Sequence, residues 1–460
     1  MSAERGSRKG MALHTKILIG LAAGAAAGVI AERLWGTTTQ LTWFVNNVAN
    51  PVGQIFLRML FMVVIPLVFT TLAVGVANLG DLGRLGRVGG KTLGFFLFTT
   101  GLAVALGLIL VNTIQPGTGL DPVIRDGLMQ QFSAQAADRV AASETTGFGI
   151  NTFVQIVPRN IVAAMNSGDM LGLIFFALIF GIALTRVPKN FAQPVLTVLE
   201  GIAQAVIEII GFAMKLAPIG VAGLIFTVTA TFGWELLGSL GMYVVMVLIG
   251  LAIHEFVTLG IIAKVMGGLG PREFFGKLKY VLVTAFSTSS SNATLPTTLR
   301  TAEEEFGVPR EIAGFVVPLG ATMNMNGTAL FEGMTVLFLA QIFGVDLSFG
   351  TQLIVVVMSI ITAIGAAGVP AGSIPLLVMV LTMVGIPGEG IALVLGVDRI
   401  LDMSRTVPNV TGDILTSIVV ARSEGFALTP SRAPDFSSES ALEAVVHEQE
   451  LHPAVETAQT

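Results

Sequence analysis

Cysteine is absent from this chain of 460 residues, and charged residues are scarce. The lack of cysteine excludes disulfide bonds and thiolate metal sites. Charged residues make up 12% of the chain, about half the fraction that is usual in soluble proteins, so the length does not indicate soluble domains. Apolar residues make up 53%, and the mean hydropathy is +0.81. Because the apolar runs are long enough to cross a bilayer, the sequence predicts an integral membrane protein.

An excess of positive charge is also absent. The formal net charge is −5, but residues 431–460 contain six acids and one arginine, which leaves 24 basic and 24 acidic residues elsewhere. There is therefore no basic face for nucleic acid, and we expect no nucleic-acid partner. The acidity belongs to an end rich in Ser, Glu and Ala, and residues 423–460 are predicted to form an acidic, disordered tail.

The apolar segments predict an all-α membrane domain at residues 17–422, with about eight transmembrane helices in the lipid bilayer. The expected spans are residues 17–31, 55–76, 92–111, 171–184, 198–229, 240–266, 312–343 and 391–420. Loops rich in Lys and Arg alternate with loops that are poor in them. By the positive-inside rule, residues 1–16 and the tail are both cytoplasmic, in a multi-pass protein of the cell (inner) membrane.

Two further segments, near 274–303 and 350–386, each break in the middle of an apolar run. The first breaks at the Ser-Thr-Ser-Ser-Ser-Asn of residues 287–292, and the second at the small residues of 365–372. Each apolar arm is too short to cross, which predicts two re-entrant helical hairpins whose tips line a cavity or lie buried in protein. The alternative for each is an imperfect single span. A polar-laced helix follows each hairpin, which indicates an inverted repeat with a binding site near the midplane.

The last expected span contains polar residues at intervals of 4, 3, 4 and 4: Asp398, Asp402, Arg405, Asn409 and Asp413. This spacing puts all five on one face of a helix. Three aspartates and one arginine sum to −2, and a buried charge of that sign calls for cations. The alternative is an ion pair of Arg405 with Asp398 or Asp402 that joins helices, which would satisfy one acid and leave two.

These residue types predict an amino-acid ligand that is cotransported with an alkali ion. One aspartate would hold the ammonium and another a metal cation, while the planar fork of Arg405 would bind a carboxylate. Asp413, Asn409 and backbone carbonyls are hard oxygen donors that suit sodium. The Asn-Met-Asn-Gly-Thr of residues 324–328 interrupts the preceding span and predicts an unwound turn with carbonyls free for an ion. Hydrogen bonding between helices is the alternative for this turn.

The remaining polar residues do not indicate an enzyme. His254 and Glu255 lie within an expected span, but Thr258 occupies the second histidine position of a zinc-binding H-E-x-x-H helix. We therefore expect His254 and Glu255 to be packing or interfacial groups. No nucleophile–base pair and no metal cluster stands out in the sequence, so enzymatic activity is not predicted.

At the two tips and the two polar helices, the sequence resembles the dicarboxylate/amino acid:cation symporter family, which includes the glutamate transporters. The resemblance covers about residues 17–422. It is carried by residues 289–296, 324–328, 365–370 and 402–413. It implies a glutamate-transporter-like homotrimer in which a static scaffold supports a moving transport domain, an elevator-type mechanism of alternating access with the two hairpins as gates. The implied activity is secondary active symport of aspartate or glutamate with sodium ions.

The resemblance also implies roles for individual residues. Arg405 would bind the side-chain carboxylate of the substrate, Asp398 would orient Arg405, and Asp402 would bind the amino group. The substrate site would be completed by Thr328, Thr406, Asn409, Ser291 and the backbone at Val369. One sodium site would use Gly320, Asn324, Asn409 and Asp413. A second would use the backbone carbonyls of Thr322, Ala363, Ile364 and Ala366.

The sequence departs from the pattern of the family in the neighbourhood of the site. Amino-acid carriers of the family usually have aspartate at the position of Asn326, in a third sodium site with Thr99 and Thr100, so the loss of that charge argues against a third sodium. Relatives often carry an arginine at the position of Ser289 or of Met403, and this chain has neither.

Several alternatives within and beyond this family remain open. Glu332 matches a position that is acidic in proton-coupled animal members, so protons are an alternative coupling ion. A C4-dicarboxylate carrier has no ammonium to bind, and such relatives lack the aspartate at the position of Asp402. A neutral amino-acid carrier would not need Arg405. An ion channel is less expected, because tips that close the site from both sides suit a carrier.

Overall fold

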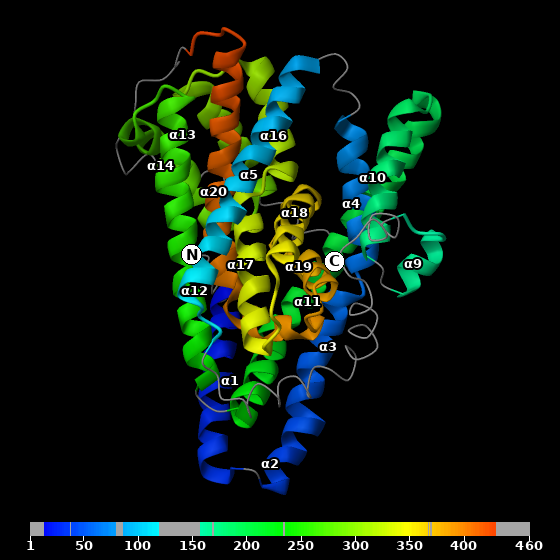
Figure 1. Cartoon of the computed structure of the whole chain (residues 1–460), viewed down its shortest axis with the longest axis vertical. Helices are drawn as coiled ribbons and strands as arrows, with labels where there is room; N and C mark the ends of the chain where they lie inside the picture. Colours follow the sequence, from blue (N-terminus) through cyan, green and yellow to red (C-terminus); the bar gives the residue numbers. More distant parts are fainter. Residues whose placement is uncertain are drawn as a thin grey trace, which may run out of the picture.

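The computed structural model describes residues 13–36, 38–79, 86–118, 157–167, 170–232, 235–366, 368 and 370–428. Within these residues the protein consists of helices and short helical turns, with no β-strand. The expected all-α class is therefore confirmed. Figure 1 shows an elongated bundle in which most helices run roughly along the long axis of the molecule.

One group of helices packs around the long helix α11 (Lys189–Phe232), which contacts α1, α3 and α4. Glycines allow α1 to approach it closely: a Cβ at Gly20 would lie 2.2 Å from the carbonyl oxygen of Pro218, and one at Gly24 would lie 2.5 Å from that of Ala222. Such small residues are typical of helix contacts in lipid. The rest of the group is α1 (Leu13–Trp35), α2 (Thr39–Phe44), η1 (Val45–Ala49), α3 (Asn50–Phe61), α4 (Val64–Leu79), α9 (Ile161–Ser167) and α10 (Met170–Arg186).

A second group of helices surrounds α20 (Ala392–Ser423), which packs against α14, α16 and α17. Almost every residue of α17 is buried, because this helix is enclosed by α5, α18 and α20. The polar residues of α17 and α20 therefore lie inside protein. The group comprises α5 (Gly86–Ile114), α12 (Glu235–Ala252), η3 (Ile253–Leu259), α13 (Gly260–Val265), α14 (Pro271–Thr288), α15 (Ser291–Arg300), η4 (Thr301–Glu305), α16 (Arg310–Met323), α17 (Asn326–Phe343), α18 (Phe349–Gly365), α19 (Ile374–Met383), η5 (Gly388–Ile391) and α20.

A pair of helices occurs at each place where a hairpin was predicted. Helices α14 and α15 pack against each other and are joined at Ser289, whose φ of 52° is left-handed, and Ser290. Helices α18 and α19 are joined by residues 366–373, in which Ala371 has a φ of 62°. The second arm of each pair has 10 residues, which is about 15 Å of helix and roughly half the thickness of a hydrocarbon core.

Five helices within the described residues are long and apolar enough to cross a membrane. They contain the expected spans at residues 17–31, 55–76, 92–111 and 198–229, and all but the last residue of the span at 240–266. The other three expected spans have a different form. The apolar helix α10 has 17 residues, α20 is continuous but charged, and the expected span 312–343 is divided into α16 and α17. A total of eight membrane helices stays a prediction.

The predicted unwound turn is found at the junction of α16 and α17. Asn324 and Met325 have non-helical backbone angles, with φ near −110° and −103° and ψ near 70° and 63°. The turn is shorter than expected, since Asn326, Gly327 and Thr328 already form the first turn of α17. A helix terminus therefore lies beside α20, with its backbone donors and acceptors available for contacts.

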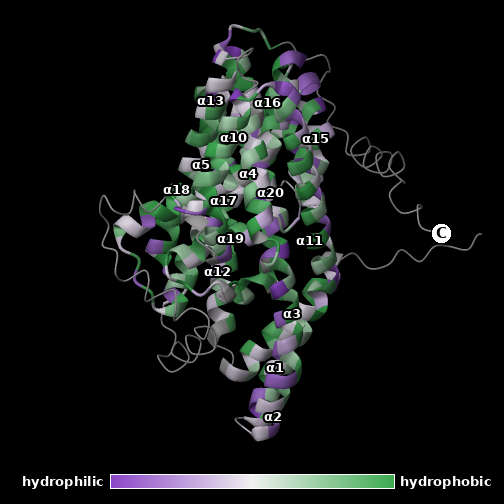
Figure 2. Ribbon diagram, turned by 90° about the vertical axis from the view of Figure 1, so that its right-hand side faces the viewer, coloured by the Kyte–Doolittle hydropathy of each residue, from purple (hydrophilic) through white to green (hydrophobic). Residues whose placement is uncertain are grey.

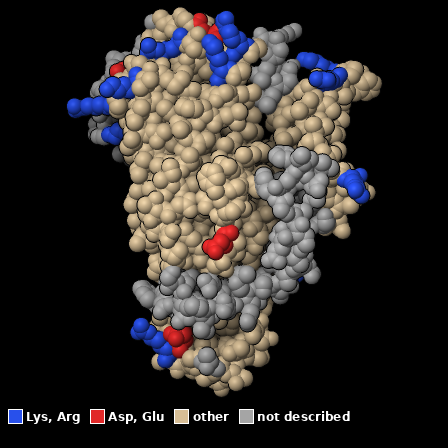
Figure 3. Space-filling view, in the orientation of Figure 1, with Lys and Arg blue, Asp and Glu red and all other residues tan. Residues whose placement is uncertain are grey.

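The surface of the bundle is apolar over most of its length. Large side chains such as Ile109, Phe212 and Ile219 are more than half exposed, and Figure 2 shows hydrophobic colour on the outside of the long helices. On the face drawn in Figure 3, Lys and Arg gather toward the end where α13 and α14 lie, above a broad belt with few charges. This arrangement is typical of a protein that spans a bilayer.

The predicted terminal segments lie almost wholly outside the described residues. Residues 13–16 of the expected N-terminal segment 1–16 belong to α1. Of the expected tail 423–460, Ser423 ends α20 and residues 424–428 follow it.

Candidate substrate and cation site

Helix α20 carries the polar stripe that the sequence predicts, and all five of its members are buried. Their exposed fractions range from 1% to 5%. The helix continues without a break through Pro408. Because the stripe faces α16, α17 and the tips of the two helix pairs, its charges lie inside the helical group and away from the apolar surface. The stripe members are Asp398, Asp402, Arg405, Asn409 and Asp413.

Arg405 is held by both neighbouring aspartates of its own helix. Its Nη1 donates to Asp398 Oδ1 at 3.0 Å, while Nε and Nη2 donate to Asp402 Oδ1 at 3.1 and 2.8 Å. The guanidinium also lies 4.2 Å from the centroid of the Phe331 ring, within the range of a cation–π contact. The sequence-based argument that an ion pair of Arg405 would satisfy only one acid was wrong. Both contacts lie within α20, so they do not join helices.

Arg399 is a further cation at this site that the sequence reasoning missed. Its Nη1 lies 3.7 Å from Asp402 Oδ2, and its side chain is 15% exposed. The signal was present in the sequence, because Arg399 stands three residues before Asp402, a spacing that brings side chains together on a helix. With Arg399 included, the segment 398–405 has two carboxylates and two guanidinium groups.

The tips of the two helix pairs meet over this charged cluster. Ser290 Oγ donates to the carbonyl oxygen of Gly368 at 2.5 Å, and the backbone N–H of Asn292 donates to the same oxygen at 3.1 Å. The backbone N–H of Ala371 donates to Asp402 Oδ2 at 3.1 Å. The two tips therefore close on each other and on Asp402. Val369, predicted to offer its backbone to the substrate, lies outside the described residues.

A cavity of about 20 Å³ lies beneath the tips, which is room for about one water molecule. Asp398 does not line the cavity but contacts Arg405, which does. Sequence reasoning did not assign substrate contacts to Ser289 or Ser373, whose buried hydroxyl groups line the cavity and have no hydrogen-bond partner in the described part of the chain. The predicted substrate residues that line the cavity are Ser291, Thr328, Asp402, Arg405, Thr406 and Asn409.

The other end of the stripe meets the turn between α16 and α17. Asp413 Oδ1 accepts a hydrogen bond from Asn324 Nδ2 at 2.9 Å. A Cβ at Gly320 would lie 2.3 Å from Asp413 Oδ1, so only glycine leaves room for this carboxylate. The amide oxygen of Asn324 is buried and has no partner among the residues described. The structure thus brings together Asp413, Asn324 and Gly320, with oxygen atoms that suit a hard cation.

The side chain of Asn409 bonds to α17, whereas its chemistry had suggested an ion ligand. Its amide oxygen accepts from the backbone N–H of Gly327 at 2.8 Å and of Thr328 at 3.4 Å. Its amide nitrogen donates to Thr328 Oγ1 at 3.2 Å. The side chain therefore caps the first turn of α17, and only the backbone carbonyl of Asn409 remains to bind an ion.

The residues predicted for a second sodium site lie on two elements in contact. Ala363 and Ile364 belong to the last turn of α18, where a helix leaves carbonyl groups without intrahelical partners, and Ala366 follows them. Thr322 lies near the end of α16, which packs against α18. Carbonyl oxygens from a helix C-terminus carry partial negative charge, which suits a cation.

The residues expected at a third sodium site and the residue expected to bind protons lie in two different places. Asn326 Oδ1 accepts from Thr100 Oγ1 at 2.8 Å and from Thr99 Oγ1 at 3.3 Å, as the spacing of these residues on α5 and α17 allows. Glu332 lies apart from them and accepts from Thr362 Oγ1 of α18 at 2.6 Å. The residues of the possible third sodium site and Glu332, the possible proton site, therefore lie apart. An amide at Asn326 brings N–H donors where a carboxylate would offer negative charge.

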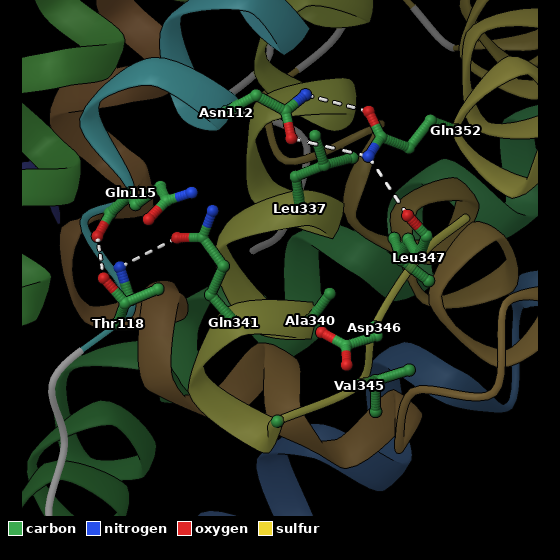
Figure 4. Close-up of a pocket in the computed structure, with 12 residues that line it drawn as sticks. Asn112, Gln115, Thr118, Leu337, Ala340, Gln341, Val345, Asp346, Leu347 and Gln352 are labelled. Atoms are coloured by element: carbon green, nitrogen blue, oxygen red, sulfur yellow. Dashed lines mark hydrogen bonds between the residues drawn. The ribbon is translucent and has the colours of Figure 1, made fainter. Parts of the chain in front are cut away.

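A larger cavity of about 340 Å³ lies away from these charges, where the ends of α5 and α17 meet the start of α18 (Figure 4). Its amides are mostly bonded to neighbours: Asn112 Nδ2 donates to Gln352 Oε1 at 2.8 Å, and Gln341 Oε1 accepts from the N–H of Gly117 at 3.0 Å. Asp346 is the one charged residue in its lining. The smaller cavity, with its guanidinium and carboxylate groups, is the better candidate for an ionic solute.

The chain is similar to known membrane symporters over most of its length. Residues 13–423 match the sodium:dicarboxylate symporter family. The proton/glutamate-aspartate symporter of Escherichia coli (strain K12) is 38% identical over 382 residues, which cover 83% of this chain and 86% of that protein. The proton/sodium-glutamate symport protein of Geobacillus stearothermophilus is 37% identical over 413 residues, covering 90% and 94% of the two chains. The C4-dicarboxylate transport protein of Bacillus subtilis (strain 168) is 32% identical over 430 residues, covering 93% and 98%.

Proposed function

This chain belongs to the sodium:dicarboxylate symporter family, and we propose that it moves aspartate or glutamate across the membrane together with sodium ions. It is a multi-pass membrane transporter and not an enzyme. The observation that carries the proposal is the guanidinium of Arg405, held by two buried carboxylates beneath the meeting point of two hairpin tips.

When the proposed substrate binds, Arg405 and Asp402 exchange their contact with each other for contacts with the substrate. Arg405 turns its planar fork from Asp402 to the side-chain carboxylate of the substrate, since a guanidinium binds a carboxylate through two parallel hydrogen bonds. Asp402, released from Arg405, accepts the substrate ammonium. Asp398 keeps Arg405 in place through its contact at 3.0 Å. The chain's own charges support this exchange, because the side-chain carboxylate and the ammonium of the ligand each meet a group of opposite sign.

Charge balance supports cotransport with cations. Residues 398–405 hold two aspartates and two arginines, so this part of the site is neutral before a substrate enters. An acidic amino acid adds a net charge of −1, and Asp413 adds another nearby. Buried charge without compensation is costly, so two cations would balance the loaded carrier. We assign one sodium ion to Asp413 with the backbone of Gly320, Asn324 and Asn409. We assign a second to the carbonyls of Thr322, Ala363, Ile364 and Ala366.

Access to this site requires movement of a tip. A cavity of about 20 Å³ is too small for an amino acid, and the N–H of Ala371 is bonded to Asp402. We propose that the α18–α19 pair opens to admit substrate from one side and the α14–α15 pair from the other, each as a re-entrant hairpin. The helices around α20 would then move as one transport domain against a scaffold built on α11. The extensive contacts within each helical group support an elevator-type mechanism.

The surface supports the proposed assembly and orientation. The large apolar side chains exposed on α1 and α11 support contacts with lipid and with other subunits of a homotrimer. Lys and Arg at the α13–α14 end support a cytoplasmic location for that end and for both termini.

A proton-coupled variant of the same activity is the second candidate. The observation in its favour is Glu332, a fully buried carboxyl with one oxygen bonded to Thr362 and the other without a partner among the described residues. Proton symport is named in two of the similar proteins. Asn326 in place of a carboxylate argues against a third sodium ion beside Thr99 and Thr100.

Counterflow in proteoliposomes tests the proposal. Vesicles loaded with unlabelled aspartate are diluted into labelled aspartate, glutamate, succinate or alanine, with sodium or choline, at clamped voltage and pH. We expect uptake of aspartate and glutamate in sodium and not in choline. Preference for succinate would identify a C4-dicarboxylate carrier, and equal uptake in choline would contradict sodium coupling. A current without saturable counterflow would identify a channel.

A further inference from the structure

The long helix that contains α12 and α13 is interrupted by the π-helical segment η3, and this segment holds two buried titratable side chains. His254 is 0% exposed and Glu255 is 2% exposed. Of the two alternatives expected from the sequence, packing or interfacial groups, this burial agrees with packing. A π-helical turn is a costly local distortion that occurs frequently at functional sites. The proposed exchange of substrate and sodium uses neither residue.

Glu255 contacts α20 through a single hydroxyl group. Its Oε1 accepts from Thr411 Oγ1 at 2.7 Å. Its Oε2 is buried and has no hydrogen-bond partner in the part of the chain that the structure describes, and the same holds for both ring nitrogens of His254. An ionised carboxylate in such surroundings would lack most of the hydrogen bonds that water gives it, which strongly favours the neutral acid.

The charged residues of α20 approach from a different side. Each residue of an α-helix turns the chain by about 100°. Measured as rotation about the helix axis from Thr411, Asp413 lies at about 200°, Arg405 at about 240° and Asp402 at about 180°. The polar stripe therefore faces away from Glu255. Asp398 and Arg399 are still farther along the helix. Arg422 shares the side of Thr411, but it lies eleven residues away and donates to the carbonyl oxygen of Gly267 at 2.6 Å.

The other elements packed against η3 bring no nearby cation either. They are α12, α13 and α5. On α13 the charged residue is Lys264, which is exposed. On α5 the charged residues are Arg87 and Lys91, which both bind Glu424. On α12 it is Glu235, at the first position of that helix. Among the described residues, Glu255 therefore has no ion-pair partner.

We propose that Glu255 is a proton-binding site of this protein, formed by the π-helical turn and Thr411 and separate from the substrate and sodium sites. The carboxylate takes one proton from water to become the neutral acid, and Thr411 donates to one of its oxygens. Protonation removes the buried charge, while release of the proton makes the contact between η3 and α20 a charge-assisted hydrogen bond.

The position of Thr411 links this proton to the rest of the molecule. It stands between Asn409, which caps α17, and Asp413. A shift of α20 during loading therefore alters the hydrogen bond to Glu255, and the proton affinity changes with it. This linkage rests on the proposed function, whereas the existence of the proton site does not.

Infrared difference spectroscopy on the purified full-length protein tests the site, since a protonated carboxyl group has a carbonyl band that disappears on ionisation. Glu255→Gln is compared with the wild type and with Glu208→Gln, which neutralises an exposed acid of α11. We expect one titrating carboxyl band to be lost in Glu255→Gln and kept in Glu208→Gln. Identical bands in Glu255→Gln and the wild type would overturn the proposal.

Thr411→Val allows a second measurement, the pH midpoint at which the Glu255 band titrates. A merely structural role of Thr411 would leave this midpoint unchanged. The hydroxyl of Thr411 stabilises the charged form of Glu255. Its removal is expected to shift ionisation of the Glu255 band upward by about one pH unit. If Glu255→Gln does not fold, this shift decides the question, and an unchanged midpoint would refute the site.

A third measurement separates this inference from the proposed function. Addition of aspartate and sodium is expected to change the Glu255 band in the wild type and to leave Glu255→Gln without that change. If the wild type binds no aspartate, the proposed function fails while the titration of Glu255 stands. If aspartate binds and the band is unaffected, the linkage to α20 is wrong.

Discussion

In the first half of the polar stripe on α20, buried carboxylates are paired with cationic side chains, whereas in the second half the buried carboxylate is paired with an amide. Asp398 and Asp402 share Arg405 at 2.8 to 3.1 Å. Asp413 accepts one hydrogen bond from Asn324 and forms no ion pair among the residues described. Both halves are almost completely buried.

This difference indicates which half needs a mobile ion. A buried carboxylate that is bonded to a guanidinium has its counter-charge within the protein. A buried carboxylate that is bonded only to an amide has no counter-charge within the protein, so a cation from solution would lower the free energy of its ionised form. We therefore assign recognition of the organic substrate to the first half and recognition of sodium to the second. Substitutions that alter one half at a time test this division.

Arg405→Cys is expected to have the largest effect. Without the guanidinium, Asp398 and Asp402 lose their buried partner, and an acidic side chain of the substrate loses a buried charge-paired contact, which costs about 3–5 kcal/mol of binding free energy. Affinity for aspartate should fall by roughly a hundredfold to several thousandfold, while serine or alanine becomes a substrate because a neutral side chain needs no counter-charge. Competition against labelled serine and aspartate in proteoliposomes measures this.

Two controls accompany the Arg405 variant. Thermal melting checks that the protein folds, and sodium dependence should persist because Asn324 and Asp413 are unchanged. A folded variant that still prefers aspartate to serine would place the substrate side chain elsewhere.

Asp413→Asn is expected to act on sodium rather than on the amino acid. The substitution removes the only formal charge of the second half and keeps its shape. A charge-assisted contact in a dry site contributes about 1.5–3 kcal/mol, so the sodium concentration for half-maximal uptake should rise about tenfold to a hundredfold. Saturating sodium should then restore most of the aspartate affinity. An unchanged sodium dependence would mean that Asp413 does not bind the ion.

Asp402→Asn is the matched substitution in the first half. It removes the counter-charge of the substrate ammonium and leaves Arg405 bonded to Asp398. Affinity for aspartate should fall about tenfold to a hundredfold, whereas the sodium concentration for half-maximal uptake, measured at saturating aspartate, should hardly change. Equal effects of Asp402→Asn and Asp413→Asn on both quantities would remove the distinction between the halves.

Much of this site could be predicted from the sequence because its residues lie at helical spacing or in short motifs. The spacing of the five stripe residues placed them on one buried face, and the Ser-rich and Gly-rich breaks located the two helix pairs. The sequence around Asn324 likewise indicated a break between two helices. Each of these signals is local, so one chain is enough to read it.

Other features could not be predicted because they depend on contacts between distant segments. The bond between Glu255 and Thr411 joins residues 156 positions apart, and nothing in either neighbourhood specifies the other. The π-helical segment η3 has no distinct signature in a pattern with a period of 3.6 residues. The side chain of Asn409 was assigned to an ion from its chemistry, while the turn of α17 that it caps became known from the structure.

Glu424→Gln is expected to have the smallest effect, and it extends the comparison to a carboxylate outside the membrane-spanning segments. Glu424 follows α20 and accepts hydrogen bonds from Arg87 and Lys91, whose side chains are 78% and 36% exposed. Water and salt weaken ion pairs at such a surface. Transport should therefore be unchanged, and the melting temperature should fall only slightly. A loss of transport as large as that of Asp402→Asn would contradict this view.

The effect of pH distinguishes this surface pair from the buried ones. The hydrogen bond and charge of Arg87, with those of Lys91, lower the pKa of Glu424 below its ordinary value. A carboxyl group whose pKa is lower in the folded state adds stability above its unfolded pKa and loses that contribution as the pH falls through the folded pKa. The difference in melting temperature between wild type and Glu424→Gln should be constant near neutral pH and shrink below about pH 4. High salt should shrink the same difference at neutral pH, because it screens exposed charges, whereas the buried pairs of Arg405 should respond far less.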